Sequence, residues 1–209
     1  MNIAHVDELD RIEMPEGFVW RPVRRRFGIR AFGVNAYSAS APGSQIVEER
    51  SESDLEHEEL YLVLRGRARF TVEGDEHELG PGELVFVRDP VLRRGAVALD
   101  PDTIVLAVGG KPGEPYAVSA WEAMFAAVPA MREERWDDAI RIHEEALVEK
   151  PDHPALLYNL ACMEARGGRG EEALAHLRRA VELEGKWAAH AASDDDFAAI
   201  RDDPRFPAS

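Results

Sequence analysis

Between Phe18 and Val108, short apolar runs alternate with turn residues. Runs of this kind, separated by glycine, proline and aspartate, predict the antiparallel strands of a sandwich or barrel, not a parallel sheet with crossover helices. We therefore expect an all-β first domain. The expected strands are 29–37, 45–49, 60–64, 68–72, 76–79, 84–87, 96–99 and 103–108.

The pattern changes after this region. Gly109, Gly110, Pro112 and Gly113 form a stretch in which no regular element is expected, and the composition then shifts to Ala, Glu and Leu. The sequence therefore predicts two domains. Their expected bounds are an N-terminal segment at 1–17, a β-domain at 18–110, a linker at 111–118 and a helical domain at 119–206.

The helical part contains an internal repeat. Trp136-Asp-Asp-Ala139-Ile140 and Gly170-Glu-Glu-Ala173-Leu174 lie 34 residues apart, which is the period of tetratricopeptide repeats. Residues 121–183 therefore resemble two such repeats, followed by a capping helix within 187–200. Pro129 predicts a kink or an early end in the first helix. Two repeats and a cap are few for a continuous core, so we expect this domain to lean on the barrel or on another subunit.

The overall charge narrows the choice of partners. The formal net charge is -15, and affinity for nucleic acids and anionic lipids depends on clustered Lys and Arg. We therefore expect no nucleic-acid partner and no membrane. No run of about 18 apolar residues and no export signal is seen, and the single cysteine, Cys162, cannot form an internal disulfide. These features favour a cytoplasmic protein.

Five arginines between residues 21 and 30 form a basic segment in this acidic chain. We interpret them as a solvated strand edge, because charged side chains commonly protect exposed edges. An anionic ligand or surface is the alternative. The five are Arg21, Arg24, Arg25, Arg26 and Arg30.

Two motifs in the β-domain resemble those of the cupin superfamily. They are His57-Glu-Glu-Leu-Tyr61-Leu-Val-Leu-Arg-Gly66 and Gly80-Pro-Gly-Glu-Leu-Val-Phe-Val-Arg-Asp-Pro90. The resemblance covers about residues 18–110 and implies a double-stranded barrel of the jelly-roll type. The fold class expected for the whole chain is therefore a cupin-type β-barrel followed by tetratricopeptide-like helical hairpins.

The metal ligands of cupins are mostly missing here. In metal-binding members the motifs supply three histidines and a glutamate, and the resemblance places the glutamate at Glu59. The histidine positions fall at Ser53, Leu55 and Arg93. Leucine has no donor atom and a guanidinium has no free lone pair. We therefore expect no metal and no other cofactor.

The same resemblance places a mixed polar set at the mouth of the barrel. Glu59, Tyr61, Arg88 and Arg93 are the candidate ligand-binding residues, because arginine pairs with carboxylate or phosphate. His57, Glu59 and Tyr61 are the candidates for acid/base catalysis. The alternative is a structural plug, in which Arg88 or Arg93 pairs with Glu59 or Asp89, and residue placement alone does not decide between the two.

In the helical part, Asn159 and Arg166 are the candidate protein-interaction residues, on the expected concave face. Met124 and Val128 occupy the opposing region, where a clamp for peptide carboxylates needs polar anchors. An apolar groove contact or an intramolecular dock is therefore favoured over such a clamp.

Two hypotheses about function follow. The favoured one is a non-enzymatic module whose barrel binds a small anionic molecule and whose helical repeats contact a protein partner or a second copy. The alternative is a cupin enzyme, either a metal-free isomerase or an oxygenase with a weakly held metal, since fold alone does not determine function. The resemblance also allows a purely structural homodimer, with the arginine-rich strand available for pairing.

Overall fold

The computed structural model describes residues 3–15, 17–114, 116 and 118–207. The chain divides into two compact units, Met1–Ala117 and Val118–Ser209, each described by itself below. Some expected boundaries include residues that are not described: 1–2 and 16 of the N-terminal segment, and 115 and 117 of the linker.

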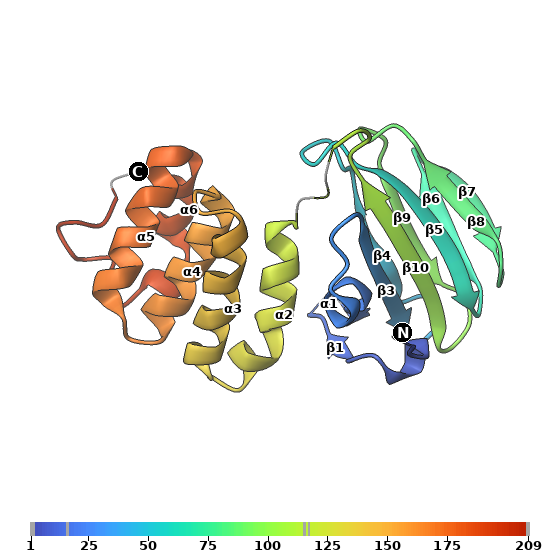
Figure 1. Ribbon diagram of the computed structural model, residues 1–209, viewed down its shortest axis with the longest axis horizontal. Coiled ribbons are helices and arrows are strands. Elements are labelled where there is room, and N and C mark those ends of the chain that lie inside the picture. Colours follow the sequence, from blue (N-terminus) through green and yellow to red (C-terminus); the bar gives the residue numbers. More distant parts are fainter. Residues whose placement is uncertain (1–2, 16, 115, 117, 208–209) are drawn as a thin grey trace. The chain divides into compact units, whose positions relative to one another are not determined.

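The first unit consists of two antiparallel sheets (Figure 1). The larger sheet has the order β1-β2-β3-β10-β5-β8 and the smaller has the order β4-β9-β6-β7. Strands far apart in sequence are therefore neighbours, as the pairing of β10 with both β3 and β5 shows. The larger sheet contains β1 (Ile12–Glu13), β2 (Val19–Arg21), β3 (Gly33–Ala39), β10 (Thr103–Gly110), β5 (Glu58–Arg65) and β8 (Leu84–Val87). The smaller contains β4 (Gln45–Arg50), β9 (Arg94–Ala98), β6 (Ala68–Val72) and β7 (Asp75–Leu79).

The core of this unit lies between the sheets. Trp20, Tyr37, Tyr61 and Phe70 are at most 7% exposed, and the rings of Tyr61 and Phe70 lie 5.4 Å apart. Successive side chains of a strand point to opposite faces. The strands that carry these residues therefore place alternate side chains in the interior. The prediction of an all-β region of short strands is confirmed.

The arginine-rich segment differs from the expected strand edge. Arg24, Arg25 and Arg26 lie in a short helix, α1 (Val23–Phe27), which ends at Gly28 with a φ of 64°. Glycine adopts this left-handed conformation without the steric cost that other residues pay. Arg21 is only 2% exposed, and its guanidinium donates to the Ser38 hydroxyl and the Val6 carbonyl. The segment is therefore not one solvated edge.

The second unit is helical. Its elements are α2 (Ala120–Arg132), α3 (Trp136–Glu149), α4 (Pro154–Arg166), α5 (Gly170–Leu183), α6 (Lys186–Ser193) and the 3₁₀ helix η2 (Asp195–Phe197). Pro129 lies inside α2, which extends three residues beyond it. The expected capping helix is two elements, α6 and η2. Among the described residues, no helix combines the length and the apolar character that a membrane span requires.

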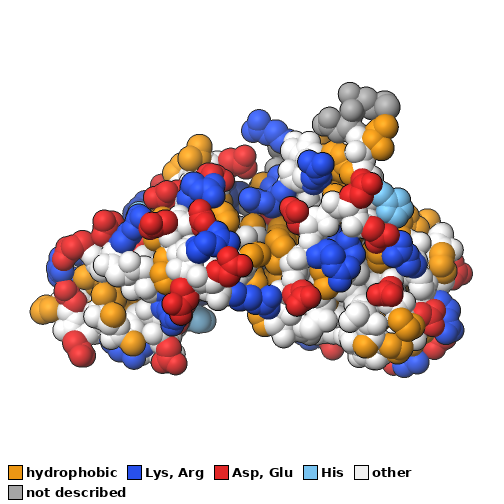
Figure 2. Space-filling view, turned by 90° about the horizontal axis from the view of Figure 1, so that it is seen from below, with side chains coloured by type: hydrophobic (Ala, Val, Ile, Leu, Met, Phe, Trp, Pro, Cys, Tyr) orange, Lys and Arg blue, Asp and Glu red, His pale blue; other side chains and the backbone are white. Residues whose placement is uncertain are grey.

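Small side chains allow these helices to pack closely. Ala139, Ala161, Ala173 and Ala180 are fully buried, and the packing pairs are α2 with α3, α3 with α4, and α4 with α5. The outer surface is charged, and Figure 2 shows acidic and basic side chains interspersed on one face. Many of these are paired, as in the contact of Arg179 with Asp152 at 2.9 Å.

The turn between β5 and β6 generates a stability prediction. Gly66 has a φ of +65°, and a Cβ there would lie 2.5 Å from Thr103 Oγ1, whereas Gly74 has a φ of +90° and open space around it. Gly66→Ala should lower the free energy of unfolding by about 2–4 kcal/mol, from backbone strain plus overpacking. Gly74→Ala should cost only the strain, about 1 kcal/mol. If urea unfolding shows equal losses of unfolding free energy in the two variants, the close contact between Gly66 and Thr103 is contradicted.

A second prediction concerns α4 and α5. His176 Nδ1 lies 2.8 Å from the carboxylate of Glu164, which is 2% exposed. This hydrogen bond is the main cause that raises the pKa of His176. The stabilisation should be complete below the unfolded pKa of about 6.5 and be lost as the pH rises through the folded value. An NMR titration should show the raised pKa and its fall in Glu164→Gln. An unchanged pKa in that variant would refute the pairing.

Candidate functional site

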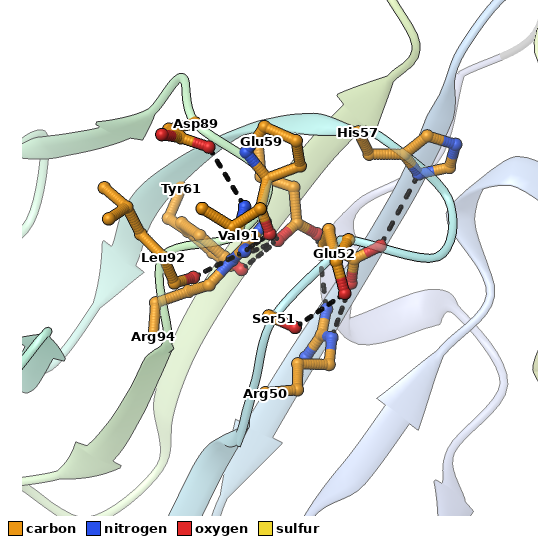
Figure 3. A network of polar contacts seen from close by, with 12 residues as sticks. Arg50, Ser51, Glu52, His57, Glu59, Tyr61, Asp89, Val91, Leu92 and Arg94 are labelled. Carbon is orange, nitrogen blue, oxygen red and sulfur yellow. Dashed lines mark hydrogen bonds and ion pairs between the residues drawn. The ribbon is translucent and has the colours of Figure 1, made fainter.

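Glu59 is the centre of a buried polar network inside the sheet unit (Figure 3). It lies in β5, where its pairing partners are Gly109 of β10 and Val87 of β8. A Cβ at Gly109 would approach Glu59 Cγ to 3.0 Å, so the glycine leaves room for this side chain. Glu59 itself is 7% exposed. The alternation of β5 therefore turns Glu59 and Tyr61 into the interior, as expected from the sequence.

Both carboxylate oxygens of Glu59 are occupied. Oε2 accepts from the Tyr61 hydroxyl at 2.5 Å and from Arg94 Nε at 3.1 Å, and Arg94 Nη2 lies 3.0 Å away. Oε1 accepts from Arg50 Nη2 at 3.2 Å. Charge-assisted bonds of this kind are the stronger class of hydrogen bond.

Arg94 is the buried arginine of the network. It is 1% exposed, and its remaining guanidinium nitrogen, Nη1, donates to the carbonyls of Pro90 and Leu92. Arg94 is thereby fixed by the backbone of the loop before β9 as well as by Glu59.

Arg50 bridges Glu59 to a second carboxylate. Its Nε donates to Glu52 Oε1 at 2.7 Å, and Glu52 is 6% exposed. The other carboxylate oxygen, Glu52 Oε2, lies 3.7 Å from His57 Nδ1. The buried guanidinium of Arg94 and the half-buried guanidinium of Arg50 are therefore matched by two carboxylates, so these four groups together carry no net charge.

The surroundings fix the protonation states of two members. Burial, followed by the charge of Glu59, raises the pKa of Tyr61 above its ordinary value. The phenol keeps its proton and uses it to donate to Glu59. Burial by itself lowers the pKa of Arg50, but the neighbouring Tyr61 and Glu59 outweigh it and raise the pKa. Arg50 is therefore cationic throughout.

The structure does not bring Arg88 and Arg93 to this network. The Arg88 side chain is 80% exposed and lies 4.0 Å from Glu58, with its guanidinium over the Phe86 ring at 5.2 Å. The Arg93 side chain is 61% exposed and pairs with Glu49 at 3.1 Å. Arg94, the first residue of β9, is the one that faces Glu59, whereas Arg93 directly before the strand points to the exposed side.

The sequence analysis missed Arg50, Glu52 and Arg94. Strand alternation was the available signal for Arg94, since one position along β9 exchanges the inner and outer faces. Arg50 ends the polar run Glu48-Glu49-Arg50 of β4 and gave no sign of burial. Its role became visible only once β4 and β5 were placed together.

The barrel residues do not fit a metal ion. Glu59 already accepts four contacts, and the nearest imidazole, that of His57, contacts Glu52 instead. Among the described residues, the group able to offer three ligand atoms lies in the helical unit, at Cys162, Asp194 and Asp196. There Asp194 accepts from Tyr158 at 2.7 Å and also caps η2. Burial raises the pKa of the Cys162 thiol, which agrees with a buried structural cysteine.

Asn159 and Arg166 both lie on α4, seven residues apart, so they share one face of the helix. The guanidinium of Arg166 lies over the Trp136 ring at 5.1 Å and 3.7 Å from Asp196. Asn159 is half-buried. Arg166 is therefore already engaged within the helical unit.

Comparison with known proteins found a family model and a number of solved structures that are similar to the chain. A family model described as tetratricopeptide repeat matches residues 130–193. The helical unit contains a tetratricopeptide repeat. No curated protein matches the chain.

Solved structures similar to the chain include several cupins. KdgF from Halomonas sp. is 19% identical, with a TM-score of 0.40, over 49% of this chain and 86% of its own. A sugar phosphate isomerase from a cupin superfamily, from Silicibacter pomeroyi, is 20% identical, with a TM-score of 0.44, over 53% and 76%. The polyketide cyclase RemF from Streptomyces resistomycificus is 20% identical, with a TM-score of 0.41, over 55% and 81%. At these identities the likeness concerns the fold alone.

The network predicts a ranking of stability losses. Glu59→Ala leaves the buried guanidinium of Arg94 without its carboxylate and should cost about 3–5 kcal/mol. Tyr61→Phe removes one of several donors to Glu59 and should cost about 1–2 kcal/mol. Arg93→Ala, which removes an exposed side chain next to Arg94, should change stability by less than about 0.5 kcal/mol. Urea unfolding of the three variants gives the ranking. A loss in Glu59→Ala as small as that in Arg93→Ala would refute a structural role for the network.

Proposed function

We propose that the sheet unit is a metal-independent binding module for a small molecule that carries a carboxylate, and that the helical unit contacts a protein partner. The observation that supports this is the position of Arg50. Its side chain is 30% exposed, whereas those of Arg94, Glu52 and Glu59 are at most 9% exposed. Arg50 is thus the cation of the network that a molecule from solvent reaches first.

Charge balance decides how such a molecule binds. An extra anion next to a neutral and largely buried set of two guanidiniums and two carboxylates would add an unpaired charge, which is costly. Exchange avoids this cost, because the ligand carboxylate takes the place of Glu52 on Arg50 and Glu52 moves to solvent. Arg94 and Tyr61 continue to hold Glu59 and keep the rest of the site in place.

The segment that carries Glu52 suits such an exchange. Glu52 lies in the turn-rich connection 51–57 between β4 and β5, and Glu56 in this connection has a left-handed φ of 54°. Non-glycine residues in this conformation carry local strain. Release of Glu52 therefore changes a short connection while leaving both strands intact, which gives ligand binding a structural consequence of the kind a sensor needs.

The protein-binding half of the proposal rests on the tetratricopeptide repeat. Repeats of this type stack into extended surfaces that commonly bind other chains. Arg166 is engaged with Trp136 and Asp196. We therefore propose that the protein partner contacts the surface of the helices without an arginine clamp for a peptide carboxylate.

One observation favours the enzyme alternative. The imidazole of His57 has 12% of its side chain exposed and faces the carboxylate of Glu52 at 3.7 Å, an arrangement in which a carboxylate orients a histidine base. Tyr61 is a weak candidate for the acid, because its proton is donated to Glu59 inside the core. Turnover that survives in both His57→Ala and Glu59→Ala would exclude this site as its source.

If the ligand carboxylate displaces Glu52 from Arg50, substitutions of these two residues should have opposite effects on ligand affinity. Binding of a panel of small carboxylates, including succinate, citrate and gluconate, is measured by calorimetry on the full chain. Glu52→Gln should strengthen binding of any member that binds by about tenfold, because the competing carboxylate is gone. Arg50→Gln should abolish binding, and Arg93→Gln, an exposed arginine on the same unit, should leave it unchanged. Equal affinities in Arg50→Gln and the unsubstituted protein would contradict the proposal.

A further inference from the structure

The outer face of β5 and β8 is apolar and exposed. Leu60 and Leu64 of β5 are 37% and 38% exposed, and Leu84 and Phe86 of β8 are 54% and 47% exposed. Leu60 pairs with Phe86, and directly paired residues share a face of the sheet. These side chains therefore form one contiguous surface, called the β5–β8 face below.

The inner positions of the same strands are also apolar or buried. Tyr61, Val63 and Val87 are at most 3% exposed, so β5 and β8 carry buried-type residues on both faces. Strands with apolar residues on both faces are typical of sheets that are covered on both sides. The sequence of these two strands is thus typical of a sheet with a covering layer on each face. The described part of the sheet unit supplies no such layer over the outer face.

Neighbouring surfaces of the same unit differ from the β5–β8 face. Across the larger sheet, the β3 residues Val34 and Ala36 are 6% and 0% exposed, where α1 packs against β3. On the smaller sheet, the exposed positions of β7 are polar or charged, and Glu78 pairs with Arg69 of β6 at 3.2 Å. The β5–β8 face is therefore not a general property of this unit.

Two charges of opposite sign lie at one end of the face. Glu58 precedes Leu60 in β5, and Arg88 follows Phe86 directly after β8. Their contact within the chain is long, at 4.0 Å, and the Arg88 side chain is 80% exposed. An edge that carries both charges can pair with the same edge of a second copy. A two-fold rotation places Arg88 of one copy beside Glu58 of the second and Glu58 beside the second Arg88, as in an isologous interface.

We propose that the β5–β8 face is covered by a second copy of this chain, in a two-fold dimer with the outer faces of the two sheets packed together. The contact has an apolar centre of leucine and phenylalanine side chains and an ionic rim formed twice by Arg88 and Glu58. It does not involve the arginine-rich segment. It goes beyond the proposed ligand site and does not depend on it, although the same strands carry Glu59 and Tyr61 on their inner faces.

The central test compares the oligomeric state of matched variants. The full chain should sediment as a dimer at micromolar concentration. Phe86→Glu buries two carboxylates in the apolar centre, one from each copy, and should raise the dimer dissociation constant at least about a hundredfold. Val148→Glu is the control, since Val148 is an apolar residue of α3 with 81% exposure, and this variant should remain dimeric.

Circular dichroism should show both variants folded, as expected for substitutions at exposed positions. An unsubstituted chain that is monomeric at all concentrations overturns the proposal. So does a dimer that Phe86→Glu leaves as stable as Val148→Glu does, because another surface would then form the contact.

Mixing of charge variants tests the two-fold geometry. Arg88→Glu makes the rim entirely acidic and Glu58→Arg makes it entirely basic, so each variant should dimerise at least about tenfold more weakly than the unsubstituted chain. An equimolar mixture should form heterodimers in preference to either homodimer, detected by mass spectrometry of the intact complex. A statistical distribution of dimers, with both variants as tight as the unsubstituted protein, would overturn the assigned rim contacts.

Discussion

The carboxylate of Glu59 is an anion placed inside a small β-sheet unit, and its neutralisation constrains the surrounding structure. An isolated buried carboxylate is costly, and here Arg94 and Arg50 supply the compensating charge while Tyr61 supplies a further proton donor. Each of these partners comes from a different strand or strand position. The network therefore ties β5 of the larger sheet to β9 and to the end of β4 in the smaller sheet, in addition to the backbone pairing within each sheet.

The same arrangement neutralises Glu59 with side chains of the chain itself. Arg94 contacts Glu59 as a cation, and its guanidinium is anchored by two backbone carbonyls. A buried ion pair of this kind contributes little net stability compared with apolar packing, but it is strongly destabilising to break. Glu52 and Arg50 extend the pair toward solvent, which is why we place ligand exchange at Arg50 and structural support at Arg94.

Local sequence patterns were sufficient to predict most of the strands and helices, but not to predict the residues of the polar network around Glu59. The turn residues and short apolar runs predicted most of the strands, and the 34-residue repeat predicted the helical hairpins. The resemblance to cupin motifs singled out Glu59 and Tyr61, which are buried in the structure. The same resemblance singled out Arg93, and an error of one position separates this exposed residue from the buried Arg94.

Other features depended on the tertiary structure. Arg50 and Glu52 are hydrophilic residues at the end of a strand and in a turn, where burial is not expected from composition. Three residues of the arginine-rich segment, Arg24 to Arg26, lie in a short helix that ends at Gly28 in a left-handed conformation, a feature that the interpretation of the segment as a strand edge overlooked. The exposed Leu84 and Phe86 have no counterpart in the sequence pattern, because an apolar strand looks the same whether its second face is covered or open.

The central claim is that arginine, and not a metal ion, neutralises Glu59. Its most direct test is elemental analysis of protein purified without a metal-carrying or metal-stripping tag, followed by calorimetry with divalent iron, manganese, zinc and nickel. We predict no near-stoichiometric metal and no micromolar binding in the sheet unit. Near-stoichiometric metal that disappears in Glu59→Ala would contradict the account.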